Sequence, residues 1–83
     1  MNYVYLIENI INSSEHYLGS TSDLKRRLIE HNSGYGCKTT KNKQWKLIYY
    51  EAYETLELAR KREYLLKHNR GSKRALYHRL DIE

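Results

Sequence analysis

The sequence has only one cysteine, no phenylalanine and no long apolar run. Because Cys37 has no second cysteine to pair with, an internal disulfide is excluded, which favours a reducing, cytoplasmic location. No apolar segment reaches the roughly 20 residues that a membrane-spanning helix needs, so we expect no membrane partner. The first residues lack the basic and apolar regions of a signal peptide. One cysteine and four scattered histidines also match no structural zinc site.

The chain is short and moderately basic. It has 83 residues, with 15 Lys and Arg against 10 Asp and Glu, and a formal net charge of +5. A chain of this length buries only about 60–65% of its unfolded surface, so we expect a single domain over residues 1–83 with its site on core elements. The positive charge fits either a solvated surface or a polyanionic partner. Nine tyrosines favour the second interpretation, because a phenol packs like an apolar ring yet keeps a reactive hydroxyl.

Apolar periodicity and turn signals predict an α+β chain with the element order β-β-α-β-α-α. The first two strands are expected to form a hairpin that Gly19 ends, because glycine there permits a backbone angle or a close approach that a Cβ would block. Because side chains alternate along a strand, Tyr3, Tyr5 and Ile7 should share one face of the first strand. The predicted strands are 3–7, 16–18 and 45–53, the predicted helices are 23–31, 56–68 and a short one after Gly71, and residues 35–44 are expected to form a loop.

Polar residues and glycines predict where the helices begin and end. Thr21 or Ser22 can cap the first helix, because a side-chain oxygen there accepts hydrogen bonds from free backbone N–H groups. Gly34 can adopt the left-handed backbone that often follows a helix. By the same reasoning, Thr55 is expected to cap the second helix and Ser72 the third.

Three side chains that can bind phosphate or transfer protons lie close together in the sequence. Tyr17 precedes the first helix, and Arg27 and His31 are four residues apart, so they share a helical face. That face borders the apolar stripe of Leu24 and Leu28. From the residues alone, more conservative interpretations stay open. The tyrosine can simply pack its ring, the arginine can be solvated, and the histidine can favour a helix C-terminus.

A carboxylate interrupts the apolar stripe of the second predicted helix. Four residues share this helical face: Leu56, Ala59, Glu63 and Leu66. A charge on a core-facing stripe costs free energy unless it is paired or binds a cation. Glu63 can therefore pair with Arg60 or Lys67, or it can be a metal ligand or an acid–base group. Hard cations such as Mg²⁺ are often held by one or two carboxylates, with water and phosphate completing the shell.

Taken together, these residues resemble the GIY-YIG nucleases, in particular their compact stand-alone bacterial members. Tyr3-Val4-Tyr5 stands at the place of the first family motif, and Tyr17-Leu18-Gly19 at the place of the second. Arg27 falls on the family's arginine helix, and Glu63 falls where the family has its metal-binding glutamate. Each short motif is weak alone, but their order and spacing together are specific.

Two positions depart from the family pattern. Tyr3 replaces the glycine of the first motif, and Leu18 replaces the isoleucine of the second. Neither change removes a chemical group, and the second is a conservative packing change. The resemblance implies a small three-stranded antiparallel β-sheet flanked by helices, which agrees with the α+β order expected from the residues.

The resemblance also implies a metal-dependent endonuclease that nicks DNA with low sequence specificity, using one Mg²⁺ or Mn²⁺ ion. Glu63 would hold the ion, and Arg27 would bind the non-bridging phosphate oxygens. Tyr17 is favoured as the general base, with Tyr5 as its partner and His31 as an assisting group. RNA or branched substrates, a role in DNA repair or recombination, and the oligomeric state all stay open.

Seven basic residues are candidates for contacts with the nucleic-acid backbone, although such charges are also typical of a solvated face. They are Lys38, Lys41, Lys43, Lys67, Arg70, Lys73 and Arg74. No major-groove reading element is recognisable, which is the reason to expect little sequence preference. The alternative function is a nucleic-acid-binding module that does not cut, or cuts only in a complex. A scaffold for a protein partner has no positive feature in the sequence.

Overall fold

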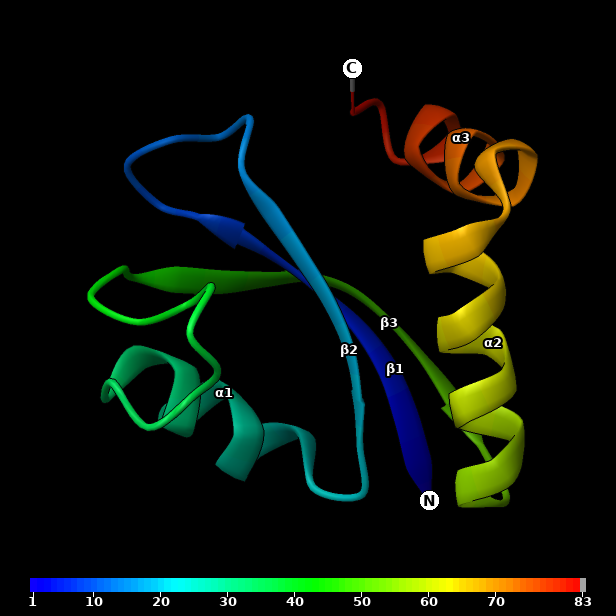
Figure 1. Ribbon diagram of the computed structural model, residues 1–83, viewed down its shortest axis with the longest axis horizontal. Coiled ribbons are helices and arrows are strands. Elements are labelled where there is room, and N and C mark those ends of the chain that lie inside the picture. Colours follow the sequence, from blue (N-terminus) through cyan, green and yellow to red (C-terminus); the bar gives the residue numbers. More distant parts are fainter. Residues whose placement is uncertain (83) are drawn as a thin grey trace.

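The computed structural model describes residues 1–82 and consists of a three-stranded sheet between two helical layers (Figure 1). The strands are β1 (Asn2–Asn9), β2 (His16–Thr21) and β3 (Trp45–Tyr53), and the helices are α1 (Leu24–Asn32), α2 (Leu56–His68) and α3 (Arg70–Arg79). This order confirms the predicted α+β fold. Both strand pairs are antiparallel, and the spatial order β2-β1-β3 makes β1 the central strand and β2 an edge strand. No helix in the described part of the chain is long and apolar enough to cross a membrane.

The side chains of β1 alternate between two separate cores, one on each face of the sheet. On the face covered by α2 and α3, the aliphatic core consists of Val4, Leu6, Leu18, Ala59, Leu66 and Leu76. On the face covered by α1, the aromatic core consists of Tyr5, Ile7 and Trp45, with Tyr17, Leu24, Leu28 and Leu47 packed against it. The predicted strand face is therefore correct, and it is the face turned toward α1. The strand period of two thus assigns neighbouring residues of β1 to different surroundings.

Several predicted boundaries are confirmed. The ranges of β3 and α2 are as predicted, and the Thr55 hydroxyl caps α2 by accepting a hydrogen bond from the backbone N–H of Leu58 at 3.2 Å. Gly34 has a φ of +84° after the end of α1, the left-handed conformation expected there.

Two predicted helix caps are wrong, and both errors come from a neighbouring side chain that competes for the same role. Asp23 caps α1 by accepting from the Arg26 N–H at 3.1 Å, while Thr21 instead accepts from the Asp23 N–H, also at 3.1 Å. Asn69 caps α3 by accepting from the Ser72 N–H at 2.9 Å. Because Asn69 also ends α2, α3 begins at once and includes Gly71, which was expected to precede it.

A partly buried ion pair attaches α2 to β3. The guanidinium of Arg62 donates two hydrogen bonds to Glu51, at 2.9 Å and 3.0 Å, and the hydroxyls of Tyr49 and Tyr53 donate to the same carboxylate. Burial raises the pKa of Glu51, but Arg62 and the two hydroxyls outweigh it and bring the pKa to about 2. This network fixes the orientation of α2, the helix that carries Glu63.

Candidate active site

The Tyr5 ring lies close against β2 because Gly19 has no side chain there. The two residues are directly opposite each other on β1 and β2, and a Cβ at Gly19 would lie 2.5 Å from the Tyr5 Oη and 2.7 Å from its Cζ. The expectation that Gly19 ends its strand is wrong, because β2 continues to Thr21, but the expected close approach that a Cβ would block is confirmed. The glycine is needed for the close approach of the phenol, which leaves Tyr5 only 2% exposed.

A buried chain of hydrogen bonds extends from Tyr5 into α1. The Tyr5 Oη lies 2.7 Å from the His31 Nε2, and the His31 Nδ1 lies 2.8 Å from the Oγ1 of Thr40. His31 and Thr40 are both completely buried. His31 is thus neither a solvated residue nor merely a favourable charge at a helix end. It reaches the site only through Tyr5, so it cannot touch a substrate itself.

Tyr17 and Arg27 lie on the more open side of this chain of hydrogen bonds. The ring centre of Tyr17 is 5.1 Å from that of His31 and 6.5 Å from that of Tyr5. Arg27 donates to Glu30 at 3.1 Å and keeps a partly exposed side chain, while its positive charge acts on Tyr5. The structure therefore brings together the four predicted site residues that come from β1, β2 and α1.

Glu63 approaches the same strand from the opposite face of the sheet. Its Oε1 accepts a short hydrogen bond from the Ser20 hydroxyl on β2, and its Oε2 lies 2.7 Å from the Nζ of Lys67. That Nζ lies 5.7 Å from the centre of the Tyr17 ring. The contacts thus pass around the edge strand β2, joining α2 to the tyrosines. The stripe on α2 is only partly a core stripe, because Ala59 and Leu66 are buried whereas Leu56 is 39% exposed.

The environment favours the neutral form of the two tyrosines and of His31. Burial raises the pKa of Tyr5, opposed by Arg27 and assisted by the negative charge of Glu63. Burial also raises the pKa of Tyr17, and neighbouring Cys37 adds to this effect. Burial and the charge of Arg27 lower the pKa of His31 below its usual value, so the imidazole is neutral at pH 7. Both phenols are therefore protonated at neutral pH, and a tyrosine that acts as a base needs a neighbouring group to accept its own proton.

Cys37 lies beside Tyr17 at the start of the turn that leads to Thr40. Burial raises the pKa of its thiol, but hydrogen bonding from Tyr17, Thr40 and Thr39 outweighs this and brings the pKa to about 7. The structure therefore adds an ionisable group next to a predicted site residue. The sequence suggested only that this cysteine has no disulfide partner.

The side chains of the site can be examined as ligands of a divalent cation. The described residues include no group of three or more His, Cys, Asp and Glu side chains able to hold a metal. Glu63 is partly exposed and would be the protein ligand, with water and substrate oxygens completing the shell, which fits Mg²⁺ or Mn²⁺. The ammonium of Lys67 pairs with one oxygen of the Glu63 carboxylate, but the Lys67 side chain is 40% exposed and can move away. The residues present therefore fit one such ion.

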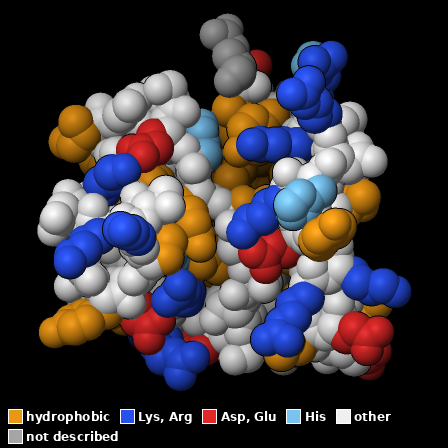
Figure 2. Space-filling view, viewed as in Figure 1, with side chains coloured by type: hydrophobic (Ala, Val, Ile, Leu, Met, Phe, Trp, Pro, Cys, Tyr) orange, Lys and Arg blue, Asp and Glu red, His pale blue; other side chains and the backbone are white. Residues whose placement is uncertain are grey.

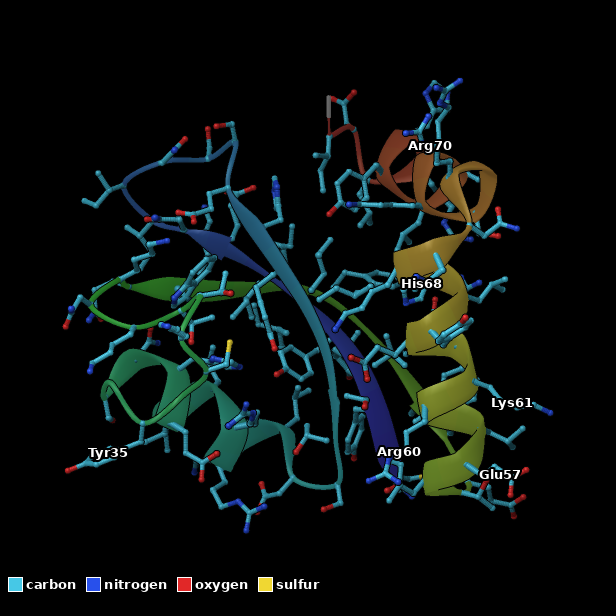
Figure 3. All side chains as sticks on the ribbon, viewed as in Figure 1. Tyr35, Glu57, Arg60, Lys61, His68 and Arg70 are labelled. Carbon is cyan, nitrogen blue, oxygen red and sulfur yellow. The ribbon has the colours of Figure 1, made fainter. Side chains whose placement is uncertain are left out.

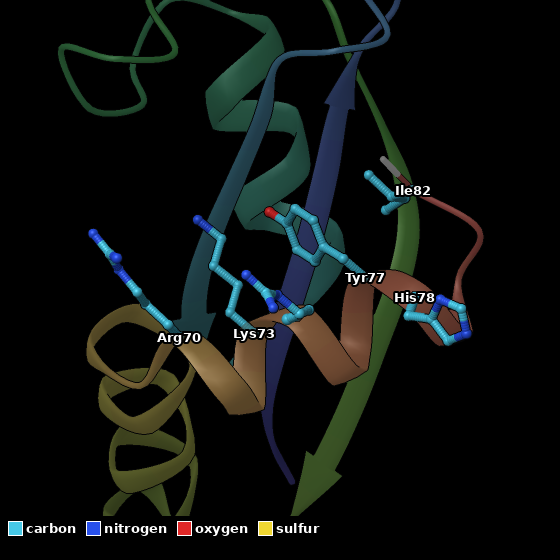
Figure 4. Close-up of a pocket in the computed structure, with 6 residues that line it drawn as sticks. Arg70, Lys73, Tyr77, His78 and Ile82 are labelled. Atoms are coloured by element: carbon cyan, nitrogen blue, oxygen red, sulfur yellow. The ribbon is translucent and has the colours of Figure 1, made fainter.

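The basic candidates are divided between the two helical sides of the molecule. Figure 2 shows Lys and Arg side chains on both the α1 side and the α2 side of one face, with a less charged strip between them. Arg70, Lys73, Arg74 and Tyr77 line an open pocket of about 430 Å³ on α3, and Figure 4 shows Arg70, Lys73 and Tyr77 projecting from the same side of that helix.

Apart from Lys67 on α2, the remaining basic candidates lie in the loop after α1. Lys38 and Lys41 are exposed there, whereas Lys43 is paired with Glu15 at 2.6 Å. On α2, by contrast, Glu57 and Lys61 point away from the sheet (Figure 3). Some charged side chains of α2 therefore point away from the site.

Besides Cys37, three residues of this site were missed by sequence reasoning. Ser20 could have been found, because strand alternation from Leu18 places it on the face that α2 covers. Thr40 and Gly36 lie in a stretch that was expected to be a polar loop, and no periodic pattern marks either of them as buried or closely packed.

The fold and the arrangement of tyrosines, arginine and glutamate define a family of nucleases. The chain matches the GIY-YIG catalytic domain over residues 1–77, and it belongs to the GIY-YIG family. The resemblance inferred from the motifs is thereby confirmed, and membership implies a nucleic-acid substrate.

Its relatives are UPF0213 proteins, a stand-alone group within this family. One from Halobacterium salinarum is 37% identical over 79 residues, covering 93% of this chain and 100% of that protein. One from Clostridium perfringens is 38% identical over 68 residues, covering 81% of this chain and 71% of the relative. The solution NMR structure of a UPF0213 protein from Bacillus halodurans is similar with a TM-score of 0.54 and 36% identity, covering 94% of this chain and 84% of that one.

Proposed function

We propose that the protein is a metal-dependent endonuclease that hydrolyses phosphodiester bonds in DNA, nicking it with low sequence specificity. The observation that carries this proposal is the convergence around β2 of Tyr5, Tyr17 and Arg27 from one face of the sheet and Glu63 from the other. A phosphate placed there would meet a guanidinium, two phenols and a carboxylate. These groups can bind the phosphate, hold a metal ion and transfer a proton, which are the tasks of phosphodiester hydrolysis.

Arg27 and Glu63 both help to stabilise the negative charge of the reacting phosphate, Arg27 directly and Glu63 through a metal ion. Arg27 donates to the non-bridging phosphate oxygens, because its planar fork matches their geometry. Glu63 holds one Mg²⁺ or Mn²⁺ ion, with Ser20 orienting the carboxylate from β2. When bound, the ion neutralises charge on the phosphate and stabilises the departing oxygen.

The proton of the attacking water passes to the tyrosines. Tyr17 is the more exposed of the two and positions the water, whereas Tyr5 receives its proton because the Tyr5 hydroxyl has an imidazole nitrogen within 2.7 Å. This assignment reverses the roles that the sequence favoured, in which Tyr17 was the base. The reason is the buried hydrogen bond to His31, which the sequence could not predict.

The basic residues on either side of the site hold the nucleic-acid backbone. Lys67 lies beside Glu63 and Tyr17, and the cations of α3 extend the positive surface along the next helix. Such contacts position a duplex without reading its sequence. A role in DNA repair or recombination, on branched DNA or on RNA, is compatible with the same chemistry. A binding module without cleavage is the alternative.

A plasmid-nicking assay tests this proposal. Supercoiled DNA is incubated with the protein and Mg²⁺ or Mn²⁺, and the conversion to open circles is followed over time. We expect Glu63→Ala to slow nicking about 100-fold or more, because a bound ion supplies several kcal/mol. Glu57→Ala is the matched control, since this carboxylate lies on the same helix but points away from the sheet. Equal rates for wild type and Glu63→Ala would show that the site is wrong. Salt-dependent DNA binding without cleavage by any of these proteins would favour the alternative.

A further inference from the structure

Thr40 is buried although it lies in a polar loop, and it contacts the His31–Tyr5 pair. Its Oγ1 lies 2.8 Å from the His31 Nδ1 and 3.1 Å from the carbonyl oxygen of Cys37. Its own carbonyl accepts a hydrogen bond from the indole Nε1 of Trp45 at 3.1 Å. The hydroxyl is thus fixed from both sides by groups that are themselves buried or hydrogen-bonded.

A glycine makes this contact possible. A Cβ at Gly36 would lie 2.5 Å from the His31 Nδ1 and 2.5 Å from the Thr40 Oγ1, and would therefore clash with both bonded atoms. The loop therefore approaches α1 as closely as a backbone without a side chain allows. Such a close approach indicates that the loop is built around this one hydrogen bond.

The hydrogen bonds at the two ends of the chain determine which nitrogen of His31 carries the proton. The Cys37 carbonyl can only accept, so the single Thr40 hydroxyl hydrogen is donated to it, and the Thr40 oxygen then accepts from the Nδ1–H of His31. A neutral imidazole carries only one ring hydrogen, so the His31 Nε2 is unprotonated and accepts the hydrogen of the Tyr5 hydroxyl, whose oxygen lies 2.7 Å away.

We propose that Thr40 is a positioning residue, which holds His31 in the tautomer protonated at Nδ1 and so keeps the Nε2 lone pair directed at Tyr5. The catalytic consequence rests on the function proposed above. As the water oxygen bonds to phosphorus, the bond from phosphorus to the leaving oxygen of the DNA breaks, and that oxygen keeps the bonding electron pair. The water gives a proton to the Tyr5 oxygen, and Tyr5 gives its own proton to the His31 Nε2. The imidazolium formed keeps its Nδ1–H on Thr40, and protons and charge balance.

Nuclear magnetic resonance of the ¹⁵N-labelled protein tests the tautomer without any activity measurement. Long-range ¹H–¹⁵N correlations distinguish a protonated ring nitrogen from an unprotonated one. We expect His31 to be protonated at Nδ1 and unprotonated at Nε2, with the three other histidines as internal references. Thr40→Val keeps the side-chain shape but removes the hydroxyl, and we expect it to populate the other tautomer. Thr40→Ser should restore the wild-type pattern.

Nicking kinetics on the same variants supply the second measurement. We expect Thr40→Val to lower kcat about 10-fold or more with little change in the KM for DNA, and Thr40→Ser to recover most of the rate. A wild-type His31 protonated at Nε2 overturns the proposal, and this result needs no folded variant. A Thr40→Val protein with an unchanged tautomer overturns it as well. If the tautomer is as expected but wild type cuts no DNA, the positioning by Thr40 stands and the proposed nuclease function fails.

Discussion

The two faces of the central strand have different compositions although their residues alternate one by one. The face toward α2 and α3 buries Val4 and Leu6 in an aliphatic core, with partly buried tyrosines packed against its margin. The face toward α1 buries Tyr5 together with two polar residues, His31 and Thr40, that are completely enclosed and hydrogen-bonded to one another. Buried polar groups contribute little net stability, but they fix geometry. The difference indicates that one face mainly stabilises the fold and the other mainly positions the chemistry.

Removing one hydroxyl from the α1 face should give the largest effect on activity. We expect Tyr5→Phe to slow nicking about 10²- to 10⁴-fold, the range of general acid–base catalysis. The free energy of unfolding should fall by only about 1–3 kcal/mol, because the Nε2 of His31 loses its buried partner. Plasmid nicking and chemical denaturation measure the two effects separately.

Tyr50 supplies the matched control for that variant. It is directly opposite Tyr5 on β3 but is 53% exposed, so Tyr50→Phe should change neither nicking nor stability. If the Tyr5→Phe protein cuts DNA at the wild-type rate, the base is another group, and Tyr17 becomes the first candidate again.

The neighbouring residue on the other face should show the opposite pattern. Leu6 is completely buried in the aliphatic core, and we expect Leu6→Ala to lower the free energy of unfolding by about 2–5 kcal/mol. The protein that stays folded should nick DNA at close to the wild-type rate, measured at low temperature. Leu58→Ala, at a position that is 46% exposed on α2, should change stability by less than about 0.5 kcal/mol. A Leu6→Ala protein that is stable but inactive would contradict the division between the two faces.

Much of this division could be predicted from the sequence, because it depends on local periodicity. Alternation along 3–7 placed Tyr5 and Ile7 together, and the helical spacing of Leu24 and Leu28 gave the face of α1 that covers them. The motif order then located the candidate site. These features are set by residues close together in the chain, where period and spacing carry the information.

The long-range contacts of the site could not be predicted in the same way. Ser20 and Glu63 meet only because α2 packs on the face of β2 opposite to Tyr17, which depends on the topology of the whole sheet. Thr40 is buried because a loop folds back onto α1, and a loop has no periodic pattern to reveal this. The predicted N-terminal caps of α1 and α3 were wrong for a related reason, since neighbouring polar residues compete and small differences in geometry decide between them.

Acid titration gives the smallest of the expected effects, and it acts on the α2 face. The pKa of Glu51 is about 2 in the folded protein, below its usual value of 4.5, so the unfolded chain binds more protons between these two values. The stabilisation from Glu51 is therefore complete above about pH 4.5 and is lost as the pH falls toward 2. A fully shielded carboxylate would lose about 3 kcal/mol, and the partial exposure of its partner Arg62 reduces this to about 1–2 kcal/mol.

The Glu51→Gln variant isolates this contribution, because other carboxylates titrate in both proteins. We expect the difference in the free energy of unfolding between wild type and variant to be constant near neutral pH and to shrink between about pH 4.5 and 2. Urea denaturation followed across this range measures it. A difference that does not change with pH would show that Arg62 holds α2 on β3 without help from the charge of Glu51.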